Sequence, residues 1–103
     1  MNNKQTSQFQ DVEQLKKSIK SNTKKCEKLE AEIKQAEQAL TSLAQFQHSE
    51  VAMERLQFLD AQRHLTMLKT LLAHTRALVA YKIVELEKQI GAQNEFTLPG
   101  MGE

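Results

Sequence analysis

Residues 12–43 read VEQLKKSIKSNTKKCEKLEAEIKQAEQALTSL, and an a/d heptad series runs through them without a break. We call the row of a and d residues the seam; its members are Val12, Leu15, Ile19, Asn22, Cys26, Leu29, Ile33, Ala36, Leu40 and Leu43. A largely apolar repeat of about 3.5 residues, sustained over several heptads, is typical of a coiled coil. The flanking positions are mostly Lys, Glu and Gln, so we predict a long helix that buries one narrow row.

Polar residues interrupt the seam once, at Ser21, Asn22 and Thr23. Such a cluster is able to cap a new helix. The heptad phase passes through it unchanged, so we expect one continuous helix. Asn22 then has two interpretations, a polar seam residue that fixes register or oligomeric state, or a point where the helix frays.

Outward from the seam, the chain contains neither proline nor glycine before Gly91. Proline and glycine are the strongest breakers of regular structure, so their absence predicts long helices and an all-α fold. It also excludes a glycine-rich phosphate loop and the strand–turn–helix elbow of many hydrolases.

The heptad phase fails at Gln47 and Glu50, which are polar where apolar residues are due. We expect the chain to reverse near Gln47–Ser49, with Ser49 as N-cap and Glu50 in a first helical turn. The alternative is a single rod about 130 Å long, which is far above the usual helix length. The predicted fold is therefore a long antiparallel helical hairpin, with helices over about 8–46 and 49–90, a C′ stop at Gly91, and tails over 1–7 and 92–103.

The second predicted helix is apolar on more than one side. Its main stripe comprises Phe58, Ala61, Leu65, Leu68, Leu72, Val79, Ile83, Leu86 and Ile90. A second ridge of Met53, Met67, Leu71 and Leu78 lies about 100° around the helix. One neighbour with a narrow seam cannot cover both, so we expect oligomerisation or partner docking to complete a bundle.

The net charge of +1 conceals an uneven distribution. Segments 16–34 and 63–82 are rich in Lys and Arg, and a hairpin would bring them together as a basic body. Its candidate phosphate contacts are Lys16, Lys17, Lys20, Lys24, Lys25, Lys28, Arg63, Lys69 and Arg76. Aromatic residues for base stacking are scarce, with no Trp and one Tyr.

Catalytic and metal-binding patterns are weak. Cys26 and the histidines His48, His64 and His74 show none of the usual ligand spacings, so we predict no metal, no cofactor and no enzyme. Cys26 is expected to be a small buried hydrophobe, or a residue that faces its copy in a parallel dimer. A single Cys, a polar N-terminus and the lack of a membrane-spanning stretch favour a cytoplasmic location.

Two functions fit this pattern. The first is a non-enzymatic protein–protein interaction module (adaptor, small chaperone, scaffold or inhibitor) that binds itself or another protein, and no membrane. Its candidate contact residues are Met67, Leu68, Leu71, Leu72, Leu78, Val79 and Ile83, with Phe96 and Leu98 in a tail able to dock as a short peptide. The alternative is a nucleic-acid-binding helical dimer that uses the basic body.

Overall fold

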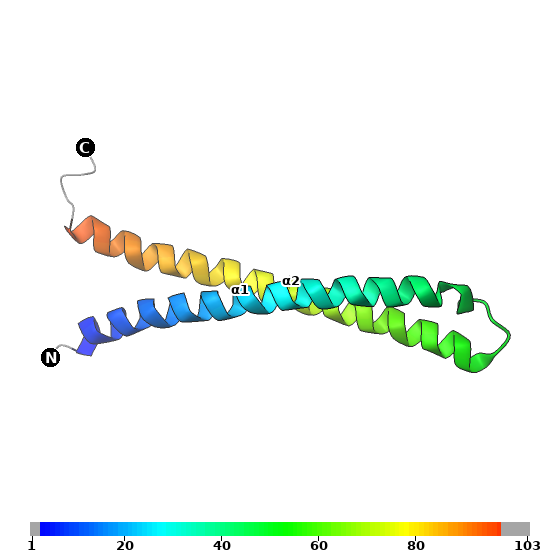
Figure 1. Cartoon of the computed structure of the whole chain (residues 1–103). Helices are drawn as coiled ribbons and strands as arrows, with labels where there is room; N and C mark the ends of the chain where they lie inside the picture. The colour runs from blue at the N-terminus through cyan, green and yellow to red at the C-terminus, as the bar shows by residue number, and fades with distance from the viewer. Residues whose placement is uncertain (1–2, 98–103) are drawn as a thin grey trace. The chain divides into compact units, whose positions relative to one another are not determined.

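The structure is a computed structural model that describes the backbone of residues 3–97 and the side chains of residues 11–91. This part of the chain forms two long helices, α1 over Asn3–Leu43 and α2 over Ala52–Thr97, with the 3-10 helix η1 over Ala44–Phe46 between them (Figure 1). The contacts divide the chain into two compact units. We call Lys24–Thr75 the turn unit, and the chain up to Thr23 together with the chain from Arg76 the terminal unit.

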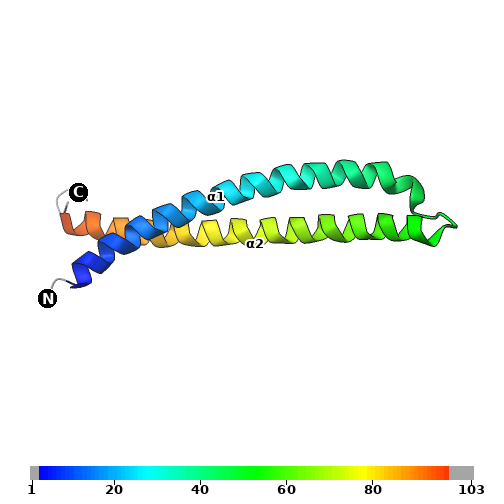
Figure 2. The same ribbon diagram turned by 60° about the horizontal axis from the view of Figure 1, so that its bottom comes forward.

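The turn unit contains the reversal of the chain. In it, the second half of α1 and the first half of α2 run antiparallel on either side of η1 (Figure 2). The buried residues are Cys26, Leu29 and Ala36 from α1, and Phe58, Leu65, Leu68 and Leu72 from α2. The seam and the main stripe therefore face each other, and the predicted all-α helical hairpin is confirmed.

The main stripe has no apolar residue at the position between Leu72 and Val79, and in the structure Thr75 occupies that position. Thr75 is buried, and its Oγ1 donates a hydrogen bond to the Leu71 carbonyl oxygen at 2.8 Å. Because its hydroxyl is satisfied within α2, the residue fills the core position without leaving an unpaired polar group.

The terminal unit pairs the first half of α1 with the second half of α2. Val12 is buried, and Leu15 and Ile19 of the seam are half-buried, as are Val79, Leu86 and Ile90 of the main stripe. The terminal unit contains a polar cluster made of Ser18, Asn22 and Lys82. Asn22 Nδ2 donates to the Ser18 carbonyl oxygen at 2.8 Å and to Ser18 Oγ at 3.2 Å, and Lys82 Nζ also donates to Ser18 Oγ.

Helix α1 is continuous through Ser21–Thr23, so the fraying interpretation of Asn22 is wrong. Thr23 Oγ1 donates to the Ile19 carbonyl oxygen at 2.7 Å, as Asn22 does to Ser18. These side chains bond back onto their own helix one turn earlier, which satisfies them without a cap.

The turn begins and ends at other residues than predicted. Helix α2 starts at Ala52 rather than Ser49, and the acidic residue of its first turn is Glu54, not Glu50. Ser49 Oγ accepts from the Val51 backbone N–H at 3.0 Å and donates to the Glu54 carboxylate. Ser49 therefore stabilises the turn three residues before the helix begins. Among the described residues no φ is positive, which explains how a reversal forms without glycine.

Both helices are longer than predicted. Helix α1 begins at Asn3 instead of near Gln8, so the tail expected over 1–7 is helical from Asn3 onward. Helix α2 continues to Thr97, and Gly91 is an ordinary helical position rather than a C′ stop. Gly91 has no positive φ and lies in open space, so nothing there forces the helix to end.

Candidate functional site

The exposed large apolar side chains of residues 11–91 all lie at or beyond the turn. In the turn unit they are Val51, Met53, Leu56, Leu59, Met67 and Leu71, and in the terminal unit they are Leu78, Tyr81, Ile83 and Val84. We call those within α2, apart from Ile83, the outer face of α2; Ile83 belongs to the main stripe and is exposed all the same. Apolar side chains are common on protein surfaces, but clusters of them mark interaction sites.

The structure divides the predicted contact residues. Met67 is 60 % exposed, Leu71 40 % and Leu78 42 %, and these belong to the outer face. Ile83 is 39 % exposed but occupies a main-stripe position, so α1 covers the stripe incompletely there. Leu68 and Leu72 are only 4 % and 7 % exposed, because they belong to the main stripe that packs against α1. These two residues are therefore removed from the candidate site.

Val79 is half-buried in the terminal unit, and it too contributes more to the hairpin than to the outer face. The predicted tail motif is not placed: Leu98 lies outside the described residues, and Phe96 belongs to the last turn of α2, beyond the described side chains.

The predicted contact list lacked five outer-face residues. They are Met53, Leu56, Leu59, Tyr81 and Val84, which are 65 %, 50 %, 44 %, 62 % and 47 % exposed. Leu56 lies eleven residues before Met67, and eleven residues make about three helical turns, so both share one side. Extending the ridge back from Met67 by this period would have found Leu56, and Tyr81 lies three residues, nearly one turn, after Leu78 of the same ridge.

A shallow hollow lies on the flank of the outer face in the turn unit. It is lined by Gln62, Arg63, Thr66 and Met67, all from α2. Its lining combines a methyl, a thioether and aliphatic stems with one guanidinium group, which suits an apolar side chain with a charge nearby.

The terminal unit has a hollow of different character. Asp11, Ser18, Lys82, Glu85 and Gln89 are among the residues that line it. Gln89 Oε1 is buried and has no hydrogen-bond partner among the described residues. Charges of both signs and two amides line it, beside Leu15 and Tyr81.

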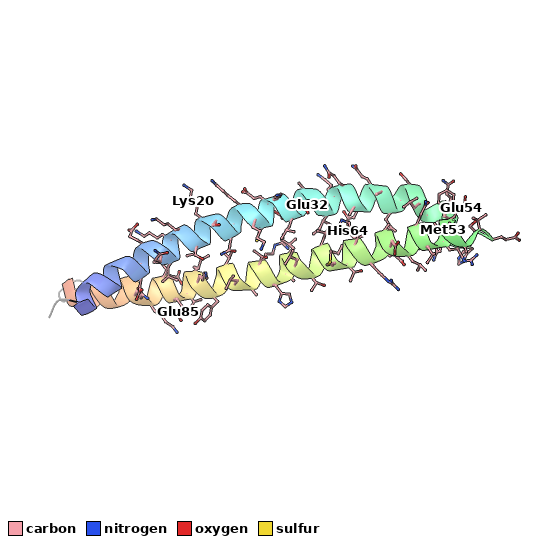
Figure 3. The ribbon with its side chains drawn as sticks, turned by 90° about the horizontal axis from the view of Figure 1, so that it is seen from below. Lys20, Glu32, Met53, Glu54, His64 and Glu85 are labelled. Atoms are coloured by element: carbon pink, nitrogen blue, oxygen red, sulfur yellow. The ribbon has the colours of Figure 1, made fainter. Side chains whose placement is uncertain are left out.

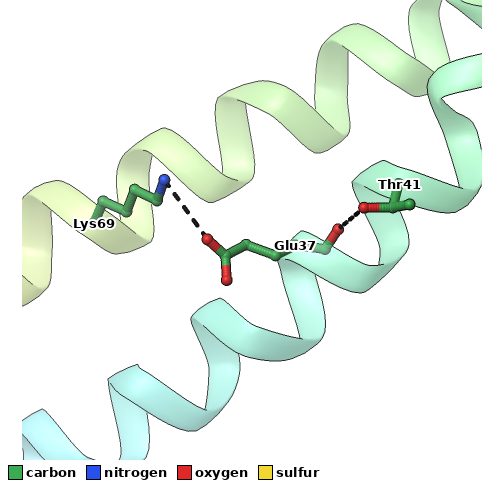
Figure 4. A network of polar contacts seen from close by, with 3 residues as sticks. All are labelled: Glu37, Thr41 and Lys69. Carbon is green, nitrogen blue, oxygen red and sulfur yellow. Dashed lines mark hydrogen bonds and ion pairs between the residues drawn. The ribbon is translucent and has the colours of Figure 1, made fainter.

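The residues of the predicted basic body are all exposed. On α1, Lys17, Lys20 and Lys24 lie on the side opposite the seam, and Figure 3 shows Lys20 pointing away from α2. On α2, Lys69 Nζ lies 3.8 Å from Glu37 Oε2 of α1, where the Glu37 carbonyl oxygen also accepts from Thr41 Oγ1 (Figure 4). Lys16 lies 3.9 Å from the Glu13 carboxylate.

Cys26 is buried in the seam, as expected for a small hydrophobe. His48, His64 and His74 are exposed. Within the described part of the chain, no group of three or more His, Cys, Asp or Glu side chains is placed to hold a metal ion. The helices described here also lack a stretch apolar enough to cross a bilayer.

Comparison with protein-family models, curated proteins and solved structures finds no match to this chain.

Proposed function

We propose that the protein is a non-enzymatic protein–protein interaction module that acts through the outer face of α2, as an adaptor, small chaperone, scaffold or inhibitor does. The observation that carries this proposal is the location of the exposed large apolar side chains, which within residues 11–91 belong to α2 and the turn and not to α1.

The burial of the main stripe supports the same proposal. Because Phe58, Leu65, Leu68 and Leu72 already pack against α1, the outer face is additional to the hairpin core. Burying apolar surface contributes about 25 cal/mol per Å², so several half-exposed Leu and Met side chains supply a useful driving force for association. A partner is what would bury them.

The test replaces Leu71 and Leu78 together by Lys. Both are about two-fifths exposed (40 % and 42 %), so we expect the helical signal in circular dichroism to stay unchanged. We expect capture of a partner from the native lysate to be lost, because a charge in an apolar interface is costly.

Gln35→Lys is the matched control, since Gln35 is exposed on α1 and lies away from the seam. The control is expected to keep the mass and the partner of the unchanged chain. If Leu71→Lys with Leu78→Lys behaves like the control, the outer face is not an interface and the proposal is wrong.

The alternative function, a nucleic-acid-binding dimer, has the exposed lysines of α1 in its favour. Two of its proposed phosphate contacts, Lys16 and Lys69, lie near carboxylates, which weakens it. Salt discriminates between the two functions: phosphate contacts weaken steeply as salt is added, whereas apolar docking hardly responds. Retention of the protein on nucleic acid at moderate salt would favour the alternative.

A further inference from the structure

A row of exposed residues with heptad spacing runs along α2 in the turn unit. Its members are Met53, Leu56, Asp60, Arg63, Met67 and Thr70, at successive intervals of three and four residues. Met53 begins the row in the first turn of the helix (Figure 3). The row lies away from Leu65 and Leu68, which pack against α1, so a further helix can approach it without displacing α1. Heptad spacing is the pattern that pairs one helix with another.

Asp60 and Arg63 are the only charged members of the row, and they lie at its centre. Both are exposed, and no ion pair recorded among the side chains of residues 11–91 includes either of them. The apolar residues Leu56 and Met67 lie immediately outside this pair, one on each side. The row is therefore apolar, then acidic, then basic, then apolar along the helix.

This order is complementary to itself when reversed. We propose that the heptad row binds the same row of a second copy of this chain, antiparallel, with a two-fold axis between Asp60 and Arg63. In this register Asp60 faces Arg63 of the second copy, Leu56 faces its Met67, and Met53 faces its Thr70. Each contact occurs twice, because the two copies are related by the two-fold axis. The inference rests on the proposed function, and names the partner.

The charges select this orientation. A parallel pair would place Asp60 against Asp60 and Arg63 against Arg63, and like charges in an interface are repulsive. The antiparallel pair instead forms two Asp–Arg contacts, and Arg binds a carboxylate with two parallel hydrogen bonds.

The hollow beside Arg63 and Met67 fits the same register. Gln62, Arg63, Thr66 and Met67 line it, and in the antiparallel pair Leu56 of the second copy lies opposite Met67. A side chain that inserts between four residues of the facing helix is the packing of coiled coils. The hollow is thus a site for Leu56 of the second copy.

The first measurement is the mass of the whole chain by light scattering, from micromolar to millimolar concentration. The row is short, about 26 Å, so we expect a mass that rises with concentration toward twice the 11.8 kDa of one chain. The mass of one chain throughout this range would overturn the inference.

The second measurement reverses the central charges. Asp60→Arg alone or Arg63→Asp alone sets like charges against each other, and we expect each to raise the Kd for dimerisation at least about tenfold. The exchange of both restores opposite charges across the two-fold axis and is expected to return the Kd to within about threefold of its original value. Circular dichroism checks that each variant stays helical, and Gln35→Glu serves as a control that leaves the Kd unchanged. A single reversal without effect, or an exchange without rescue, would overturn the pairing.

The third measurement fixes the orientation by cross-linking in a Cys26→Ala background. Met53→Cys with Thr70→Cys places the two thiols seventeen residues apart on one helix, about 26 Å, which is too far for a short thiol cross-linker within one chain. We expect covalent dimers from this double variant and none from Met53→Cys alone. Dimers from Met53→Cys alone would show a parallel pair, and a lack of dimers from both would show another register; either result overturns the inference.

These results also separate this inference from the proposed function. The chain could stay monomeric and yet capture a different protein, and lose that capture when Leu71 and Leu78 are replaced by Lys. This result would overturn the second copy as the partner and would support the proposed protein–protein interaction function. A chain that neither dimerises nor captures a protein overturns both.

Discussion

Helix α1 and helix α2 differ in how they use their apolar residues. Between residues 11 and 43, every large apolar side chain of α1 belongs to the seam and is buried or half-buried. Helix α2 buries a comparable row, the main stripe, and in addition leaves apolar residues such as Met53 and Met67 more than half exposed. The first helix is adapted to one neighbour, whereas the second has a face left over after the hairpin has formed.

The difference shows that length and helix content alone do not reveal an incomplete core. Both helices have few breakers and many good helix formers, so each is a stable choice for its segment. What separates them is the width of the apolar surface around the helix. A row with a period of about 3.5 residues fits one partner, and apolar residues beyond that row need another.

The largest predicted effect tests whether the main stripe and the outer face of α2 have different roles, one in the hairpin core and one on the surface. Leu68→Ala removes a side chain that is 4 % exposed, and we expect it to lower the free energy of unfolding by about 2–5 kcal/mol. Leu71→Ala, three residues later on the exposed ridge, is expected to change it by only about 0.5 kcal/mol at monomer concentrations. Urea unfolding followed by circular dichroism measures both.

Equal losses from Leu68→Ala and Leu71→Ala would contradict the division between the main stripe and the outer face. In that case Leu71 would be buried as Leu68 is, by contacts that the hairpin alone does not supply.

A second prediction concerns the one polar member of the seam. Asn22 is half-buried and bonds to Ser18 within its own helix, so Asn22→Leu breaks no bond between helices and adds apolar burial. We expect a gain of about 1 kcal/mol in the free energy of unfolding, measured by urea titration. Asn22→Ala, which adds little area, is the control. A loss of stability or a change of mass with Asn22→Leu would indicate that Asn22 sets register across helices.

A third prediction concerns Gly91, which lies inside α2 with open space around it. Gly91→Ala is expected to raise the free energy of unfolding by about 0.5–1 kcal/mol, because Ala has less conformational freedom to lose. Thermal unfolding followed at the helical band measures it. If α2 instead ended at Gly91 in a left-handed conformation, Ala would destabilise the protein. The sign of the change in stability therefore shows whether Gly91 is a helical position or the end of the helix.

The smallest effect is expected at the ion pair between Lys69 and Glu37. Their side chains are 56 % and 53 % exposed, and such surface pairs contribute about 0.2–1 kcal/mol. A double-mutant cycle with Lys69→Gln and Glu37→Gln should give a coupling energy at the low end, lowered further by added salt. A coupling well above this range would mean that the contact between α1 and α2 depends on charge rather than on the seam.

The parts of the fold that follow from periodicity could be predicted from the sequence. The seam and the main stripe are long repeats, and the spacing of a repeat predicts which residues lie on the same side of a helix. The start of α2 was placed three residues early, because Ser49 has the residue type of an N-cap but uses its hydroxyl within the turn. Gly91 likewise has the residue type of a stop, yet in the structure it is helical.

The candidate site was harder to predict, because burial depends on which row packs against α1. Leu68 and Leu71 are three residues apart and chemically identical, so composition cannot separate them. The structure assigns Leu68 to the core and Leu71 to the surface. Phase relative to Phe58 and Leu65 is the signal that distinguishes them.

The turn braced by Ser49 also has a consequence for the order of folding. Residues near the turn, such as Leu43 and Phe58, are close in sequence, so bringing them together restricts the unfolded chain little. Val12 and Ile90 of the terminal unit are separated by most of the chain. If they came together first, they would close a long loop, which costs more conformational entropy. Pairing that begins at the turn shortens each later loop. We therefore expect the hairpin to form from the turn toward the two ends of the chain.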